Sequence, residues 1–248
     1  MRTFFNDQLS KPHLDDIMRN RLVIFDCYKT LIEAEEIGNM AYRRAVGELF
    51  GVEGGRTDAD PTATTIQTVV IQIANKRGVS KHEIESKSDV ILPSYENIFE
   101  DCVRTGEAIV LPGVQELLEA LHRNEVPFGI YTGDSFRTVD ALLKKAGLET
   151  YFPQDMRSCG SNETPDRTEL LASAIQKAER KYGMNFSKSY IYVVDDSWRG
   201  IKAAEILGIK SVGVAGDPRR FERYGTNPTY FFADLSDYKR VLDIIILD

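Results

Sequence analysis

The sequence predicts an α/β protein, with a doubly wound, mostly parallel sheet and a small all-helical segment inserted after the first strand. Short runs of β-branched and aromatic residues recur along the chain without polar alternation. Such runs are typical of strands that are buried on both faces of a parallel sheet. Amphipathic stretches of helical period separate most of the runs, so strands and helices alternate as they do in βαβ units.

The first strand is expected at residues 21–25, where the run RLVIF ends at Asp26. Four later runs have the same character and lie at 126–132, 189–194, 210–216 and 229–233. Four amphipathic helices are expected at 113–124, 136–147, 167–183 and 198–208. Three of these helical stretches run into a glycine, which can end a helix in a left-handed turn.

The chain changes character between about Glu33 and Val110, where buried-strand runs are absent and several amphipathic helical stretches appear. Pro61, paired glycines and acidic residues predict a loop at 51–65. A helical insertion at this point is expected to cover the carboxyl edge of the sheet as a cap. The predicted domains are a core of residues 1–33 and 111–248 and a cap of residues 34–110.

Composition and charge argue against several classes of protein. A net charge of -7 does not suit a nucleic-acid partner, which needs clustered positive charge. No apolar run is long enough to span a bilayer, and the N-terminal stretch has acids where a signal peptide has its apolar region. The three cysteines lack the spacing of a zinc site or a disulfide framework. We therefore expect a cytoplasmic protein without a membrane or nucleic-acid partner, either monomeric or homodimeric.

Polar residues collect where three predicted strands end, and parallel strands bring such ends to one crevice. They are Asp26 after the first strand, Thr132, Gly133 and Asp134 after the second, and Asp195 and Asp196 after the third. Carboxylates brought together from two strands repel one another unless a cation lies between them. Magnesium prefers such oxygens together with water and phosphate, so the pattern predicts a Mg²⁺ site. Strand-end acids that only cap the following helices are the alternative.

Three stretches resemble motifs of the haloacid dehalogenase superfamily. VIFDCYKTLIEAEEIGNMAYRRA resembles the first motif, YTGDS the second, and VVDDSWRGIKAAEILGIKSVGV the fourth. The fourth match is the longest, and the resemblance covers the core from Arg21 to Val214. It points to the phosphatase and β-phosphoglucomutase-like branch, which carries a helical cap after the first motif.

The resemblance implies a role for each matching residue. Asp26 attacks the substrate, while Thr132 and the amide of Gly133 hold the oxygens of the transferred group. The implied magnesium ligands are Asp26, Asp195, Asp196 and the backbone carbonyl of Tyr28. The implied reaction is hydrolysis of a small phosphorylated metabolite through an aspartyl-phosphate intermediate.

Two positions next to the nucleophile depart from the family pattern. Tyr28 stands where the phosphatases carry a second aspartate that acts as general acid and base. A phenol with an ordinary pKa of about 10 is a poor base at neutral pH. Tyrosine at this position resembles the 2-haloacid dehalogenases instead. Lys29 replaces a glycine that lets the loop turn tightly.

A third departure lies in SNETPDRTELLASAIQ, which aligns with the Lys-Pro-Asp segment of the family. Thr164 occupies the position of the lysine that neutralises charge in the site. Arg167, one helical turn further along, is the candidate substitute for that lysine.

The sequence leaves three functions open. A magnesium-dependent phosphohydrolase ranks first, because the fourth motif with its paired acids favours phosphoryl chemistry. A 2-haloacid dehalogenase-like hydrolase is the second, since Tyr28 resembles that group. The third is a protein of the same fold that has lost efficient catalysis and serves in binding or regulation.

Overall fold

The structure, a computed structural model, describes residues 20–60 and 63–248. The predictions for the chain before position 20 and for Pro61 lie outside the described residues. A six-stranded sheet in the order β5-β4-β1-β6-β7-β8 forms the centre, and each neighbouring pair is parallel. The strands are β1 (Leu22–Phe25), β4 (Phe128–Thr132), β5 (Arg157–Cys159), β6 (Ile191–Asp195), β7 (Lys210–Val214) and β8 (Tyr230–Phe232). The predicted doubly wound parallel sheet is confirmed.

Strand β5 is the one strand of this sheet that the hydrophobic pattern did not predict. Its three residues, Arg157, Ser158 and Cys159, are buried although two of them are polar. The Arg157 guanidinium donates to the Phe152 carbonyl at 2.6 Å and pairs with Asp140 at 3.0 Å. These partners compensate for the burial of the Arg157 charge and hold β5 at the edge of the sheet. The strand is too short and too polar to show a hydrophobic pattern in the sequence.

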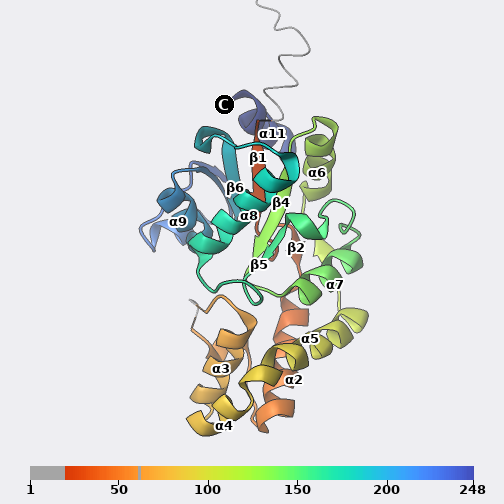
Figure 1. Cartoon of the computed structure of the whole chain (residues 1–248), viewed down its shortest axis with the longest axis vertical. Helices are drawn as coiled ribbons and strands as arrows, with labels where there is room; N and C mark the ends of the chain where they lie inside the picture. Colours follow the sequence, from red (N-terminus) through yellow and green to blue (C-terminus); the bar gives the residue numbers. More distant parts are fainter. Residues whose placement is uncertain (1–19, 61–62) are drawn as a thin grey trace, which may run out of the picture.

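Helices cover both faces of the sheet, as Figure 1 shows. The β1 side chains alternate between two hydrophobic clusters, as expected for a strand buried on both faces. The covering helices are α6 (Val114–Arg123), α7 (Phe136–Ala146), α8 (Arg167–Tyr182), α9 (Trp198–Leu207) and α11 (Tyr238–Leu247). Leu22 and Ile24 pack in the cluster that contains residues of α8 and α9, whereas Val23 and Phe25 pack in the cluster that contains residues of α6, α7 and α11.

Glycines end three of these helices, as the sequence predicts. Gly147, Gly183 and Gly208 follow α7, α8 and α9 with φ values of 71°, 64° and 69°. This left-handed conformation carries little steric cost in glycine because it has no Cβ. The chain therefore leaves each helix toward the next strand of the sheet.

Four helices lie between the first strand and the rest of the core and fill the lower half of Figure 1. They are α2 (Glu35–Phe50), α3 (Ile66–Lys76), α4 (Lys81–Ser86) and α5 (Ser88–Thr105), and we call them the helical insertion. The chain enters and leaves it through β2 (Ile32–Glu33) and β3 (Ile109–Val110), which pair antiparallel. A short 3-10 helix, η1 (Arg56–Asp58), interrupts the predicted loop before α3.

Hydrogen bonds fasten the helical insertion to the carboxyl edge of the sheet. The Ile66 amide, at the start of α3, donates to Ser161 Oγ at 2.9 Å. The Thr64 hydroxyl donates to the Pro165 carbonyl at 2.8 Å. Both bonds reach the segment between β5 and α8, so the insertion meets the core there.

Two predictions from composition bear on the described residues. Within residues 20–60 and 63–248, no helix combines the length and apolarity that crossing a bilayer would require. Cys27, Cys102 and Cys159 are buried and unpaired, as expected for reduced thiols.

The left-handed backbone of Lys29 generates a first testable prediction. Lys29 has φ 59°, which costs a residue with a Cβ about 1 kcal/mol relative to glycine. Its ammonium pairs with the exposed Glu35 at 2.6 Å, a contact of small value at the surface. We expect Lys29→Gly to raise the free energy of unfolding by about 1 kcal/mol in urea denaturation. Lys29→Met keeps the Cβ but removes the charge, so it should not raise the free energy of unfolding. Equal stabilisation by both variants would show that the left-handed backbone of Lys29 is not strained.

Candidate active site

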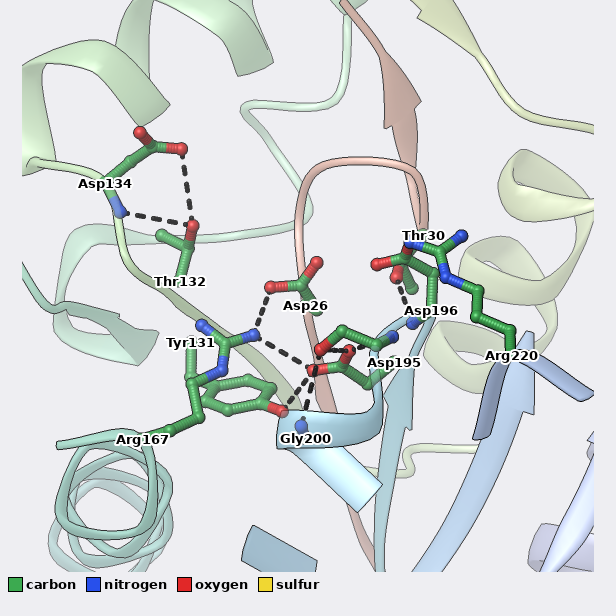
Figure 2. A network of polar contacts seen from close by, with 11 residues as sticks. Asp26, Thr30, Tyr131, Thr132, Asp134, Arg167, Asp195, Asp196, Gly200 and Arg220 are labelled. Atoms are coloured by element: carbon green, nitrogen blue, oxygen red, sulfur yellow. Dashed lines mark hydrogen bonds and ion pairs between the residues drawn. The ribbon is translucent and has the colours of Figure 1, made fainter. Parts of the chain in front are cut away.

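Three carboxylates from two neighbouring strands converge at the carboxyl edge of the sheet. Asp26 follows β1, Asp195 ends β6 and Asp196 comes next, and the parallel pairing of Phe25 with Val194 places the two strand ends side by side. One oxygen of each carboxylate lies within 4.8 Å of the other two, and all three residues are buried. Figure 2 shows the group with its partners. The sequence expectation that these acids share one crevice agrees with this geometry.

Arg167 bridges two of the three carboxylates through a single nitrogen. Its Nη2 donates to Asp26 Oδ1 and, at 2.9 Å, to Asp195 Oδ2. The guanidinium lies 4.0 Å from the centre of the Tyr131 ring, a cation–π contact. Arg167 is the first residue of α8, and Asp166 caps that helix by accepting from two of its amides. The helix start therefore delivers a positive charge to the candidate nucleophile.

Asp195 is fully engaged by its neighbours. Its Oδ1 accepts from the amide and the hydroxyl of Ser197, both at 2.7 Å. Its Oδ2 accepts from the Tyr131 hydroxyl as well as from Arg167. A Cβ at Gly200 would collide with both Asp195 and the Tyr131 hydroxyl, so the glycine makes this close approach possible. Asp195 thus orients its neighbours and has little capacity left for a metal ion.

Asp196 has a different set of partners from the loops around it. Its amide donates to Thr30 Oγ1 at 3.1 Å, and its Oδ2 pairs with Arg220 at 2.7 Å. Arg220 lies in the short helix α10 (Arg219–Glu222) and is half exposed. This arginine therefore approaches the carboxylates from the solvent side, whereas Arg167 approaches from within.

The two arginines do not fully balance the three carboxylates. Burial, followed by the charge of Asp195, raises the pKa of Asp26 well above the ordinary carboxyl range, although Arg167 opposes the shift. Burial and then Asp195 also raise the pKa of Asp196 to about 6, against the effect of Arg220. A buried group of carboxylates that holds protons so strongly lacks positive charge. The oxygen donors and this charge deficit fit a magnesium ion.

Thr132 and Gly133 end β4 beside the carboxylates. Thr132 is buried, and its hydroxyl lies 3.4 Å from both the amide and a carboxyl oxygen of Asp134. A Cβ on Gly133 would collide with the Thr64 carbonyl of the helical insertion. The absence of a side chain at Gly133 thus lets the insertion approach the edge of the sheet.

Asp134 and Tyr28 face the same cavity as the carboxylates. Burial raises the pKa of Asp134 to about 6, while the Thr132 hydroxyl and the charges of Arg167 and Arg56 oppose the shift. Burial, followed by the charge of Asp134, raises the pKa of the Tyr28 phenol well above its ordinary value. Tyr28 therefore stays neutral, whereas the carboxyl of Asp134 changes protonation near neutral pH.

The structure does not bring Thr164 to the carboxylates. Its hydroxyl donates to Glu169 at 2.8 Å, and Thr164 is not among the residues that line the cavity. The side chain that contacts Asp26 from this segment belongs to Arg167 instead. Thr164 lies in the loop before α8, whereas Arg167 is the first residue of that helix and its guanidinium reaches both Asp26 and Asp195.

The cavity over the carboxylates has a volume of about 290 Å³ and lies between the core and the helical insertion. Its cationic lining side chains are Lys29, Arg56, Arg167, Arg199 and Arg220. Acidic side chains line the same cavity, and three of the cations pair with them: Lys29 with Glu35, Arg167 with Asp26 and Arg220 with Asp196. The cavity therefore combines carboxylates with cationic donors, although the whole chain has a net charge of -7.

Sequence reasoning missed Tyr131, Ser197 and Arg220 as members of the site. The strand alternation of β4 could have placed Tyr131 on the α8 face, and Ser197 follows the paired acids directly. Arg220 stands in the basic run DPRRFER after β7, but nothing in that run indicates which arginine turns inward.

Comparisons with known proteins agree with this architecture. A family model described as haloacid dehalogenase-like hydrolase matches residues 20–208. A probable pseudouridine-5'-phosphatase of Drosophila melanogaster is 31% identical over 134 residues, which cover 53% of this chain and 57% of that relative. The chain therefore spans little more than half the length of this curated relative.

Solved structures show the same fold at low sequence identity. CbbY from Rhodobacter sphaeroides, solved with phosphate, has a TM-score of 0.70 and 18% identity, with 88% of this chain and 95% of that chain covered. A β-phosphoglucomutase from Clostridium difficile has a TM-score of 0.69 and 15% identity, with 92% and 97% covered.

The close approach at Gly200 generates a second prediction. Gly200→Ala should push Asp195 away from Tyr131 and lower the free energy of unfolding by about 2 kcal/mol, measured in urea. Gly47→Ala is the matched control, because Gly47 lies inside α2 and the nearest atom to an added Cβ is 3.9 Å away. That control should gain up to about 1 kcal/mol from helix propensity. Equal effects at both positions would show that Gly200 is not sterically constrained.

The raised pKa of Asp134 generates a third prediction. A carboxyl with a folded-state pKa of about 6 and an unfolded value of about 4 binds its proton more tightly when folded. Its contribution to stability is therefore full below about pH 4 and is lost as the pH rises through about 6. Asp134→Asn should remove this fall in the unfolding free energy between about pH 4 and 6, measured by urea denaturation with chelator present. If the unfolding free energy of the variant depends on pH as that of the wild type does, the pKa of Asp134 is not raised.

Proposed function

The chain belongs to the haloacid dehalogenase-like hydrolases, and on that premise we propose that it is a magnesium-dependent phosphohydrolase of a small phosphorylated metabolite. The reaction proceeds through an aspartyl-phosphate on Asp26. One observation carries the proposal: the buried group of Asp26, Asp195 and Asp196 lies in a cavity lined by cations. Such a site suits a phosphate ester together with a metal ion.

Asp26 acts as the nucleophile in this proposal. One of its carboxylate oxygens attacks the phosphorus atom, and the ester oxygen leaves on the opposite side. Arg167 holds Asp26 Oδ1 through Nη2 and so orients the carboxylate. In the proposal, its other terminal nitrogen, Nη1, donates to an oxygen of the transferred group. This arginine thereby takes over the charge neutralisation that Thr164 lacks.

Thr132 and Gly133 bind the oxygens of the transferred group. The Thr132 hydroxyl can rotate from Asp134 toward a phosphate oxygen, and the Gly133 amide lies at the same strand end. Donors fixed in a buried site stabilise the charge that develops on these oxygens. They contribute most when water is excluded, and the helical insertion, which we propose acts as a cap, provides that exclusion.

Magnesium would be held by Asp26, Asp196 and the backbone carbonyl of Tyr28. Asp195 supports the site by orienting Arg167 and Tyr131, since both of its oxygens are engaged. When bound, the ion supplies the positive charge that lets a phosphate approach the nucleophilic carboxylate. Arg220 must release Asp196 at least in part for this to occur, and its half-exposed position leaves room for that movement.

The substrate belongs to the class of small phosphate esters. The pseudouridine-5'-phosphatase relative supports this class, and a pseudouridine phosphate is one member of it. A cavity of about 290 Å³ holds a compound of this size. The reduced, buried cysteines are compatible with the cytoplasmic location that we propose.

The dehalogenase alternative rests on Tyr28 alone. The clustered carboxylates weigh against it, because haloacid chemistry in this superfamily uses neither a metal ion nor the paired acids that stand here at the end of β6. The alternative of a binding protein without efficient catalysis draws on the same substitution. Two observations favour catalysis. Arg167 contacts the candidate nucleophile Asp26, and the three clustered carboxylates could hold a metal ion.

The proposed function generates a fourth prediction. The purified protein should release phosphate from some members of a panel of phosphate esters, including pseudouridine 5'-phosphate, and chelator should abolish the release. Asp26→Asn should lower kcat by at least about 10³-fold because the nucleophile is lost. Asp155→Asn, at an exposed carboxylate paired with Lys181, is the matched control and should retain full activity.

Two outcomes would contradict the proposal. Halide release from 2-haloacids in the presence of chelator would establish the dehalogenase activity instead. Binding of phosphate or a phosphate ester without turnover, detected as a magnesium-dependent rise in Tm, would establish a binding protein.

A further inference from the structure

The proposed reaction needs a group that the family position does not supply. The leaving oxygen must receive a proton when the ester bond breaks, and the water that cleaves the aspartyl-phosphate must lose one. The acidic side chains that line the cavity are Asp26, Tyr28, Glu35, Tyr42, Tyr95, Asp134 and Asp196. Which of them can exchange a proton near neutral pH decides how the reaction is completed.

The three phenols do not meet this requirement. Burial is the largest cause that raises the pKa of Tyr28, Tyr42 and Tyr95 above the ordinary tyrosine value. For Tyr28 and Tyr42 the charge of Asp134 is the next cause. Each phenol holds its proton too tightly to act as a base at neutral pH, and a donor so weakly acidic gives little help to a leaving alkoxide.

Three of the four carboxyl groups already have other roles. Asp26 is the nucleophile and contacts Arg167. Asp196 pairs with Arg220 on the metal side of the site. Glu35 is more than half exposed and pairs with Lys29 at 2.6 Å. Asp134 remains, a carboxyl group that lines the cavity and makes no ion pair within residues 20–60 and 63–248.

The location of Asp134 suits a proton carrier. It follows β4, the strand next to β1, so it stands at the same sheet edge as Asp26. Figure 2 shows Asp134 on one side of Asp26 and Asp196 with Arg220 on the other. The transferred group would be held on the metal side, while the remainder of the substrate extends toward Tyr28 and the helical insertion. Asp134 and Tyr28 both line the cavity, and the charge of Asp134 acts on the Tyr28 phenol.

Groups from every neighbouring element act on Asp134. Arg167 of α8 and Arg56 of η1 favour its charged form, and the Thr132 hydroxyl also does so. Burial opposes them and is the larger effect, which leaves the pKa at about 6. The charge of Asp134 also acts on five buried thiols and phenols, which are uncharged at neutral pH because burial raises the pKa of each: Cys27, Tyr28, Tyr42, Tyr95 and Cys159.

Building on the proposed function, we propose that Asp134 is the general acid and base of the reaction, a task that Tyr28 cannot perform. In the first step Asp26 forms its bond to phosphorus, the ester P–O bond breaks, and the carboxyl proton of Asp134 passes to the leaving oxygen. In the second step a water oxygen bonds to phosphorus, the Asp26–phosphorus link breaks, and a water proton passes to Asp134. The carboxyl returns to its starting state and inorganic phosphate is released.

The test compares two esters in Asp134→Asn. An alkyl phosphate, identified with the wild-type enzyme, has a leaving group that needs a proton. Nitrophenyl phosphate has a leaving group that is stable without one. We expect kcat for the alkyl ester to fall by about 10²–10⁴-fold in the variant, with KM little changed. With the nitrophenyl ester we expect a burst of nitrophenolate stoichiometric with enzyme, followed by slow turnover, because the aspartyl-phosphate then lacks its base.

Further variants separate a chemical role from a structural one. Asp134→Glu should restore part of the alkyl-ester activity, since it returns a carboxyl group. Asp155→Asn should show neither the loss nor the burst, because that residue lies outside the cavity. The pH profile of kcat for the alkyl ester should lose one limb in Asp134→Asn. Thermal unfolding shows whether each variant is folded.

Defined results would overturn the inference. Wild-type rates on alkyl esters in Asp134→Asn, or equal losses on both esters without a burst while the variant stays folded, would exclude Asp134 as the proton carrier. Asp26→Asn should abolish the burst, which ties it to the nucleophile. If the wild-type enzyme releases phosphate from no ester, the proposed function fails first and this inference falls with it.

Discussion

Like-charge repulsion among Asp26, Asp195 and Asp196 is the constraint around which this end of the molecule is built. Two parallel strands deliver the three carboxylates to a buried pocket, where their mutual repulsion is weakly screened. Arg167 and Arg220 oppose that repulsion from opposite sides. Burial, and after it the charge of Asp195, still raises the pKa values of Asp26 and Asp196. In the proposed function, a divalent cation would supply the further positive charge.

Steric details at two glycines allow this charge arrangement to form. Gly200 permits Asp195 and Tyr131 to meet against α9, and Gly133 permits the helical insertion to approach the strand ends. The first contact orients Arg167, which lies on the Tyr131 ring. The second brings η1 and the start of α3 over the carboxylates, and so encloses the cavity. Packing and electrostatics at this edge therefore depend on each other.

In the proposed mechanism, neighbouring residues compensate for the departures from the family pattern. Thr164 cannot supply a charge, but Arg167 at the start of the next helix reaches the same carboxylate. Tyr28 cannot exchange a proton, but Asp134 at the end of the next strand carries a carboxyl with a pKa of about 6. In both cases a group of suitable chemistry stands on an adjacent element. A site can keep a chemical task when its usual residue is lost, provided that the fold offers a second position at the same edge.

The sequence alone predicted the parallel sheet, five of its six strands, four of the helices that cover it, and the gathering of the acids at one edge, because periodicity and strand ends are local patterns. The sequence did not predict strand β5, since its three mostly polar residues show no hydrophobic period. It also did not predict the partners of the acids, because Tyr131, Ser197 and Arg220 reach the site from different elements. Only the tertiary structure decided that Arg167, and not Thr164, contacts Asp26, because the direction of a side chain at a helix start depends on how the whole helix packs against the sheet.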